Sequence, residues 1–125
     1  MSDSNQPTDF PQVTDLRSAL DVLRQYDNEV IETDTEVDPI AELSGVYRYV
    51  GAHGTVKRPT QRGPAMIFNK VKGYDDMRVL IGLLSSRQRV ARMFNTTSEN
   101  ITNYFREAVN HPINPIVVGK EKAVC

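Results

Sequence analysis

Apolar residues recur at three- and four-residue steps in four stretches of the chain, and this spacing predicts amphipathic helices. The first is predicted over residues 15–26, with Thr14 or Asp15 as its N-cap. The second begins at Asp38-Pro39, where a capping carboxylate precedes a proline, and stops at Gly51. A third follows Ser85 or Ser86, and a fourth runs over residues 98–109. The predicted apolar faces are Leu16, Ala19, Leu20, Leu23 and Tyr26; Ile40, Leu43, Val46, Tyr47 and Val50; Val90, Ala91, Met93 and Phe94; and Ile101, Tyr104, Phe105, Ala108 and Val109.

Four shorter apolar segments predict strands. They span residues 29–33, 65–69, 78–83 and 116–118, and turn-forming residues flank them. The order of elements is then α-β-α-loop-β-β-α-α-β. This order predicts an α+β fold in which a small mixed sheet is flanked by helices.

Three other features shape this expectation. Residues 1–12 are polar, contain two prolines and lack a periodic pattern, so we expect a flexible arm. Residues 51–64 also lack a period and contain several glycines and prolines, which predicts a loop. Gly45 inside the second helix predicts close packing against another backbone.

The composition is that of a soluble globular protein: 125 residues, 39% hydrophobic and 25% charged. A single cysteine, Cys125, excludes an internal disulfide framework. The aliphatic stretch at residues 79–84 is too short to cross a bilayer, and the acidic, polar start is unlike a signal peptide. We therefore expect a cytoplasmic protein with neither a membrane nor a nucleic-acid partner.

Charge is distributed unevenly. Residues 1–50 hold 3 Lys/Arg and 11 Asp/Glu, a net of −8, whereas residues 51–125 hold 12 Lys/Arg and 5 Asp/Glu, a net of +7. One interpretation is a basic surface for phosphate or an acidic partner. The favoured interpretation is that the two halves fold against each other with their charges as solvated neighbours.

No group of residues has the spacing of a metal site. Asp34, Glu36 and Asp38 alternate as in a calcium loop, but Pro39 and Gly45 then stand where that loop needs Gly and Glu. Asp38 is interpreted as a helix cap. His53 and His111 lack a second ligand at helical spacing, and His111 is expected at the carbonyl end of a helix.

Candidate anion sites are equally weak. The first candidate consists of Gly51, Gly54, Lys57 and Arg58. It follows the end of a predicted helix, whereas a phosphate is held by the free N–H groups at the start of one. The second, Gly119-Lys120, lacks the upstream glycine of a P-loop. Arg87, Arg89 and Arg92 could contact an anion or nucleic acid. The favoured interpretation is a solvated helix face, since little aromatic interleaving surrounds them.

No catalytic constellation emerges from the residues. Asp75 and Asp76 are adjacent in a predicted tight turn and should point apart. Cys125 has no basic neighbour that would activate its thiol. We assign no catalytic, cofactor-binding or metal-binding residue within this chain.

Four motifs in order resemble the start of the UbiD family of aromatic acid decarboxylases: DLRSAL, ETDTEVDP, GPAMIFNKVKGY and VLIGLLSSRQRVARMF. The segment AELSGVYRYVGAHGTVKRPTQRGPAM is most similar to the protocatechuate and gallate (hydroxybenzoate) decarboxylase branch. His53 departs from that pattern, where a small residue is expected.

The resemblance implies an N-terminal piece of a carboxy-lyase that removes CO2 from a hydroxylated benzoate. It implies a flexible arm at 1–12, an N-terminal α/β domain at 13–118 and the start of a connection at 119–125. The whole enzyme would use prenylated FMN with Mn2+ and K+, and would form a homo-oligomer. Its catalytic and cofactor residues would lie outside this chain, which would act as a scaffold for the remaining domains. Two alternatives stay open: a stand-alone anion- or protein-binding module, and a non-catalytic decarboxylase subunit.

Overall fold

A computed structural model describes residues 13–52 and 63–123 of the chain. These residues form a three-stranded sheet in the order β1-β2-β3, with strands β1 (Val30–Thr33), β2 (Ala65–Phe68) and β3 (Val79–Ile81). Strand β1 runs parallel to β2, and β3 runs antiparallel to it, so the sheet is mixed as predicted. The α+β fold class is therefore confirmed.

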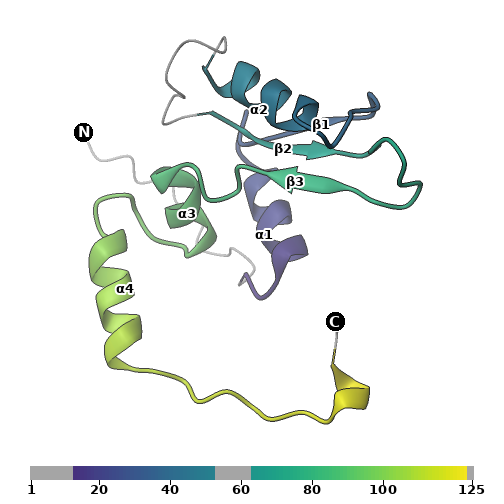
Figure 1. The fold of residues 1–125 in the computed structure, drawn as a ribbon. Helices are drawn as coiled ribbons and strands as arrows, with labels where there is room; N and C mark the ends of the chain where they lie inside the picture. Colours follow the sequence, from purple (N-terminus) through teal and green to yellow (C-terminus); the bar gives the residue numbers. More distant parts are fainter. Residues whose placement is uncertain (1–12, 53–62, 124–125) are drawn as a thin grey trace.

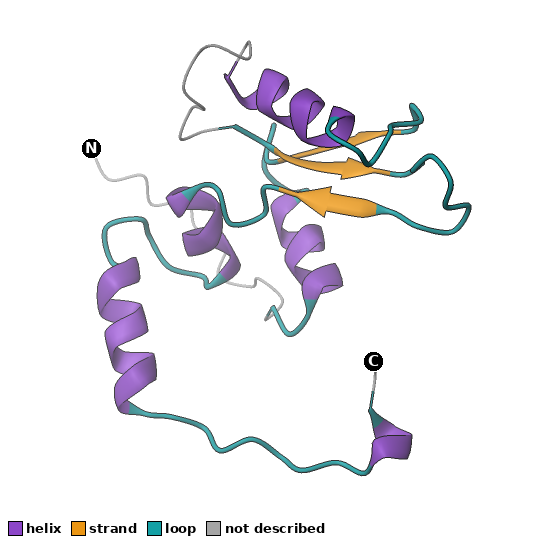
Figure 2. Ribbon diagram, viewed as in Figure 1, coloured by secondary structure: helices purple, strands orange, loops and turns teal. Residues whose placement is uncertain are grey.

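Helices cover the two faces of the sheet. Helix α2 (Glu42–Ala52) lies on one face, and helices α1 (Leu16–Leu23) and α3 (Arg87–Met93) lie on the other (Figures 1 and 2). Helix α4 (Ile101–Asn110) packs beside α3, and an extended segment leads from it to a short 3-10 helix, η1 (Lys120–Lys122). The described part of the chain is thus a three-layer unit with a projecting C-terminal segment.

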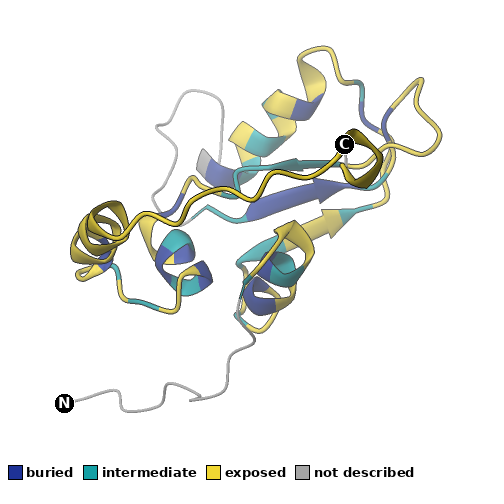
Figure 3. Ribbon diagram, turned by 90° about the horizontal axis from the view of Figure 1, so that it is seen from below, coloured by how far each residue is buried: buried dark blue, intermediate teal, exposed yellow. Residues whose placement is uncertain are grey.

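Side-chain alternation along the strands builds a separate core on each face. All four residues of the central strand β2 are buried (Figure 3), as expected for a strand covered on both faces. Beneath α2, the buried core consists of Val37, Leu43, Met66 and Phe68. Between α1 and α3 it consists of Ala19, Leu23 and Met93.

The structure corrects the predicted limits of two helices. Helix α1 has its predicted N-cap, since Asp15 accepts the Ser18 N–H at 2.7 Å, but it ends at Leu23 and not at residue 26. Helix α2 begins at Glu42 and not at Asp38, because Ala41 has a left-handed φ of 67° that no helix accommodates. The prediction that Gly51 stops this helix was also wrong, since α2 includes it.

Three further predictions fail for lack of a packing partner. Residues 116–118 form no strand, because no described strand lies beside them to accept their backbone hydrogen bonds. Gly45 packs against no other backbone, since a Cβ added there would meet nothing within 4 Å. Ile40, predicted to be buried, is 84% exposed. The predicted arm at 1–12 and most of the 51–64 loop lie outside the described residues.

A buried arginine joins α3 to the ends of all three strands. The Arg89 side chain is 1% exposed, and its Nε donates to Glu29 Oε2 at 2.8 Å, just before β1. Its remaining nitrogens donate to the carbonyl of Gly63, before β2, and at 2.6 Å to that of Gly82, after β3. Arg92 donates to the other Glu29 oxygen, and its guanidinium lies 4.0 Å from the Tyr26 ring centroid.

These contacts revise two expectations. The interpretation of Arg87, Arg89 and Arg92 as a solvated helix face was wrong for Arg89, which lies in the interior. The acidic first half and basic second half do fold against each other, as favoured, through Glu29 with Arg89 and Arg92. This contact is buried instead of solvated, so it contributes to the core.

Replacing Glu29 with Gln should strongly destabilise the fold. Two guanidinium groups would then lose their counter-charge inside the protein, which costs about 3–5 kcal/mol for a buried pair. Urea unfolding followed by circular dichroism measures the loss. Glu32→Gln is the matched control, because the exposed Glu32–Arg24 pair is worth less than about 1 kcal/mol. Equal effects of the two substitutions would contradict the central role of Glu29.

Gly82→Ala should cost more stability than Gly73→Ala. Both glycines have a positive φ, 79° and 84°, but only at Gly82 would a Cβ collide, at 2.2 Å, with the Tyr47 hydroxyl. Gly73→Ala therefore measures the backbone strain alone, about 1–2 kcal/mol. Gly82→Ala should add a further loss of at least about 1 kcal/mol from the overlap. Thermal unfolding of the two variants tests this difference, and an equal loss would show that Tyr47 moves aside freely.

Stability should fall in acid partly through two capping carboxylates, Asp15 at the start of α1 and Asp38 in the turn before α2. The Ser18 backbone N–H lowers the pKa of Asp15, and the Ile40 backbone N–H, with Lys72, lowers that of Asp38. A carboxylate whose pKa is lower in the folded state than in the unfolded state stabilises the fold at pH values above its unfolded-state pKa of about 4. This stabilisation is lost as the pH falls through the folded-state pKa. Asp15→Asn with Asp38→Asn should flatten the dependence of unfolding free energy on pH below about 4. An unchanged acid slope in the double variant would refute this assignment.

Candidate functional site

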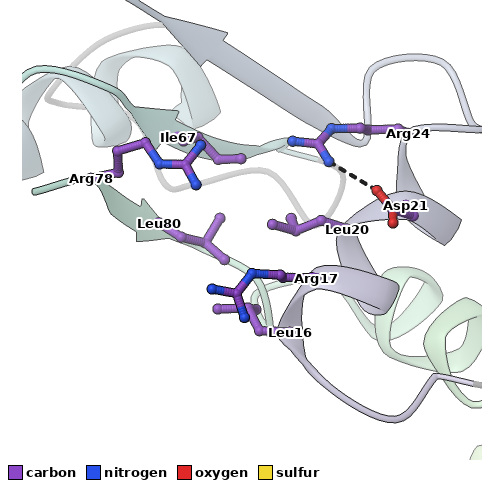
Figure 4. A pocket seen from close by; sticks show the side chains of 8 residues that line it. All are labelled: Leu16, Arg17, Leu20, Asp21, Arg24, Ile67, Arg78 and Leu80. Carbon is purple, nitrogen blue, oxygen red and sulfur yellow. Dashed lines mark hydrogen bonds and ion pairs between the residues drawn. The ribbon is translucent and has the colours of Figure 1, made fainter. Parts of the chain in front are cut away.

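A groove opens between α1 and the sheet face that α1 covers (Figure 4). Its volume is about 480 Å³, within the range of small-molecule sites. We call it the arginine groove. It is lined by Leu16, Arg17, Leu20, Asp21, Arg24, Ile67, Arg78 and Leu80.

Helical and strand periodicity place these side chains together. The lining residues of α1 and its C-cap lie at positions 16, 17, 20, 21 and 24, two neighbouring rows of residues that recur every three or four positions and so share one side of the helix. In the sheet, Ile67 of β2 pairs with Leu80 of β3, so the two lie side by side on the same face. Arg78, two residues before Leu80, points to that face as well. Ile67 is buried and forms the floor of the groove.

One of the three arginines is already paired. Arg24 Nη2 donates to Glu32 Oε1 at 2.5 Å, and Nη1 to Asp21 Oδ1 at 3.1 Å. The hydrogen bond from Arg24 lowers the pKa of Glu32, and the same bond raises the pKa of Arg24. Both groups therefore stay charged and bound to each other.

The other two arginines are available. Within residues 13–52 and 63–123, the side chains of Arg17 and Arg78 form no hydrogen bond or ion pair. The lining carries three arginines and one aspartate, a formal charge of +3 − 1 = +2. The arginine groove thus offers two free guanidinium groups above an apolar floor, which is an arrangement for an anion with an apolar body.

The three arginines predicted as a possible anion site lie elsewhere and serve the fold. Arg87 donates to the Ser98 carbonyl at 2.8 Å and to Thr102 Oγ1 at 2.9 Å, which ties α3 to α4. Arg89 and Arg92 bind Glu29. None of the three lines the arginine groove.

The acidic candidates are also engaged locally. Asp34 accepts from Asn69 Nδ2 at 2.9 Å, and Asp38 accepts from Ile40 N at 2.8 Å and from Lys72 Nζ at 3.1 Å. Asp38 therefore caps the turn that precedes α2. Across the described residues, no group of three or more His, Cys, Asp or Glu side chains could hold a metal ion.

His111 lies where expected, at the C-terminal end of α4, with Nδ1 3.0 Å from the Glu107 carbonyl oxygen. Asp75 and Asp76 are exposed in the turn between β2 and β3, and Gly119-Lys120 lies exposed at η1. The remaining candidates, His53, Gly54, Lys57, Arg58 and Cys125, fall outside the described residues.

Sequence reasoning missed Arg17, Arg24 and Arg78 as members of one site. The seven-residue interval between Arg17 and Arg24 is a usable signal, since it spans two helical turns. Arg78 could not be added from the sequence, because only the pairing of β3 with β2 brings it to the same face as α1.

A second surface is strongly apolar and lies on α4 and the segment after it. Phe94, Tyr104 and Phe105 pack together, with ring centroids 5.3–6.0 Å apart, yet each stays partly exposed. Farther along, Ile113 and Val117 are each 95% exposed. Of the face predicted for this helix, only Ile101 is buried.

None of the helices in the described part of the chain is long and apolar enough to cross a membrane.

Comparison with known proteins relates the chain to decarboxylases. The sequence model of the 3-octaprenyl-4-hydroxybenzoate carboxy-lyase N-terminal domain, UbiD_N, matches residues 22–109. A gallate decarboxylase of Lactiplantibacillus plantarum is 54% identical over 112 residues, which are 90% of this chain and 23% of that enzyme.

Solved structures agree. A 3,4-dihydroxybenzoic acid decarboxylase of Klebsiella pneumoniae superposes with a TM-score of 0.74 at 50% identity, covering 82% of this chain and 21% of that one. A 3,4-dihydroxybenzoic acid decarboxylase of Enterobacter cloacae superposes with a TM-score of 0.77 at 48% identity, covering 86% of this chain and 22% of that one. A vanillic acid decarboxylase of Sedimentibacter hydroxybenzoicus superposes with a TM-score of 0.61 at 29% identity, covering 87% of this chain and 22% of that one.

The chain therefore spans less than a quarter of the length of these relatives. The family model covers more than half of the 125 residues, and the fold of the solved relatives matches that of the described residues. This chain belongs to the UbiD family of carboxy-lyases and corresponds to the family's N-terminal domain.

Proposed function

We propose that this chain is the N-terminal domain of a non-oxidative decarboxylase that removes CO2 from a hydroxylated benzoate of the protocatechuate or gallate type. The observation that carries the proposal is the 54% identity to a gallate decarboxylase along 90% of the chain. The likeness to two 3,4-dihydroxybenzoic acid decarboxylases, at 48–50% identity, supports the same substrate class.

Within such an enzyme, the chain acts as a scaffold and carries none of the catalytic groups. Residues 13–118 form the domain, and residues 119–125 begin the connection to the next one. The exposed apolar side chains on α4 and the following segment support this role. A surface such as that formed by Val109, Ile113 and Val117 is typical of a face covered by further protein.

The family's cofactor, prenylated FMN, and its Mn2+ and K+ ions would be held by the rest of the enzyme. The described residues do not fit these groups. They contain no cluster of potential metal ligands, and the one carboxylate of the arginine groove, Asp21, is paired with Arg24. No glycine-rich loop opens a described helix to receive a phosphate. The chemistry of decarboxylation is therefore assigned to residues beyond those described.

A second candidate is a small non-catalytic subunit of a decarboxylase complex. A related vanillic acid decarboxylase whose structure was solved together with a truncated second component favours this alternative. The reading frame distinguishes the two. Several hundred further codons after Cys125 support the N-terminal domain, whereas a stop codon directly after it supports the subunit.

The isolated 125-residue chain should neither bind flavin nor release CO2. Protocatechuate and gallate are the substrates to test, with 13C-labelled carboxylate and detection of 13CO2, and the purified chain should show no visible absorbance. The L. plantarum gallate decarboxylase, assayed in parallel, is the positive control. A co-purifying yellow chromophore, or turnover above a protein-free blank, would refute the scaffold role.

A chimaeric enzyme tests the proposal positively. In the chimaera, the chain replaces the matching 112 residues of the L. plantarum gallate decarboxylase. The chimaera should decarboxylate gallate at a rate within about tenfold of the parent enzyme. A tenfold change in rate corresponds to about 1.4 kcal/mol, and a scaffold that preserves the packing should perturb the barrier by no more than this. Deletion of the same residues should abolish activity. A folded chimaera without activity, or an active deletion variant, would contradict the proposed role.

A further inference from the structure

We propose that the arginine groove binds a small organic acid. Arg17 and Arg78 hold its carboxylate, and the apolar floor receives its hydrocarbon body. This inference rests on the groove alone and is independent of the decarboxylase proposal.

The charged side of the groove is built from two different elements. Arg17 comes from α1 and Arg78 from the residue just before β3, and both guanidinium groups lie at the groove (Figure 4). Neither has a hydrogen-bond or ion-pair partner within the described ranges. A carboxylate is a natural ligand for such groups, because its two oxygens match the planar fork of a guanidinium.

Nearby acidic groups form no ion pair with the side chains of these two arginines, although Asp15 attracts Arg17 at a distance. Asp21 and Glu32 both bind Arg24, at 3.1 Å and 2.5 Å. Arg78 contributes to lowering the pKa of Glu32 only by attraction at a distance, and its contribution is smaller than that of the hydrogen bond from Arg24. Asp21 and Glu32 together offset the charge of Arg24, so the attraction for an anion comes from the Arg17 and Arg78 guanidinium groups, which form no ion pair with a described residue.

The apolar side sets the kind of acid. Leu20 and Leu80, both half-buried, form an aliphatic surface next to the guanidinium groups, over the buried Ile67. A ligand with an apolar body would remove this surface from water, whereas a bare inorganic anion would leave it exposed. The lining has no aromatic side chain on which a nucleobase could stack. Both features favour a small amphipathic acid over a nucleic acid or a free phosphate.

A titration of the 125-residue chain with benzoate tests the proposal. Methyl resonances of the leucines and isoleucine in the groove should shift and saturate in 13C NMR spectra. Acetate has the same carboxylate but lacks the apolar ring of benzoate, and benzyl alcohol has the ring but no charge. Each should bind at least tenfold more weakly than benzoate. Inorganic phosphate should also fail to saturate the groove.

Paired variants assign the effect to the two arginines. Arg17→Gln with Arg78→Gln should weaken benzoate binding at least tenfold. The control, Arg106→Gln with Lys122→Gln, removes the same charge from exposed positions away from the groove. It should change the affinity for benzoate less than twofold. Circular dichroism should show both double variants folded, since none of the four side chains forms a hydrogen bond with a described residue.

Three results would overturn the proposal. The first is an absence of saturation up to about 20 mM benzoate, well above a millimolar Kd, as expected for a groove that only receives another protein segment. The second is equal binding of acetate, which would mean nonspecific attraction of anions. The third is an equal loss of binding in the control variant.

Discussion

The buried contact between Arg89 and Glu29 holds the domain together. Sixty residues separate the two groups in the sequence, and through them α3 is fixed to the starts of β1 and β2 and to the end of β3. Inside a protein, a charge without its partner is far costlier than a missing apolar contact. The position of α3, and with it that of α4, therefore depends on this one ionic centre.

The helices cover the two faces of the sheet to different extents, and this difference produces the groove. Helix α2 closes its face with a continuous apolar core that includes Leu43 and Phe68. On the other face, α1 and α3 pack against each other through Ala19, Leu23 and Met93. Helix α1 thus leaves β3 only half-buried, and arginines occupy the edge of the groove there. The domain combines a rigid support on one face with a charged recess on the other.

Membership in a carboxy-lyase family gives these surfaces a context. Relatives of known structure are more than four times as long as the matched region, and the described residues contain no metal-ligand cluster. Exposed apolar residues such as Val109 and Ile113 lie on α4 and the segment after it, and neither belongs to the two cores. Under the proposed function, this domain would supply packing surfaces, and the rest of the enzyme would supply the chemistry.

The sequence by itself determined what local interactions control: the four helices, three of the strands, the helix caps to within one residue (Thr14 or Asp15, Ser85 or Ser86), and the family. It failed where a residue's role depends on distant groups. Arg89 has the local pattern of a solvated helix residue, yet the fold places Glu29 and two backbone carbonyls around it. Residues 116–118 have the composition of a strand but no neighbouring strand in the described part of the chain. Burial and pairing are properties of two segments at once, so only the tertiary structure decided which charges lie inside and that α1 and β3 together form the arginine groove.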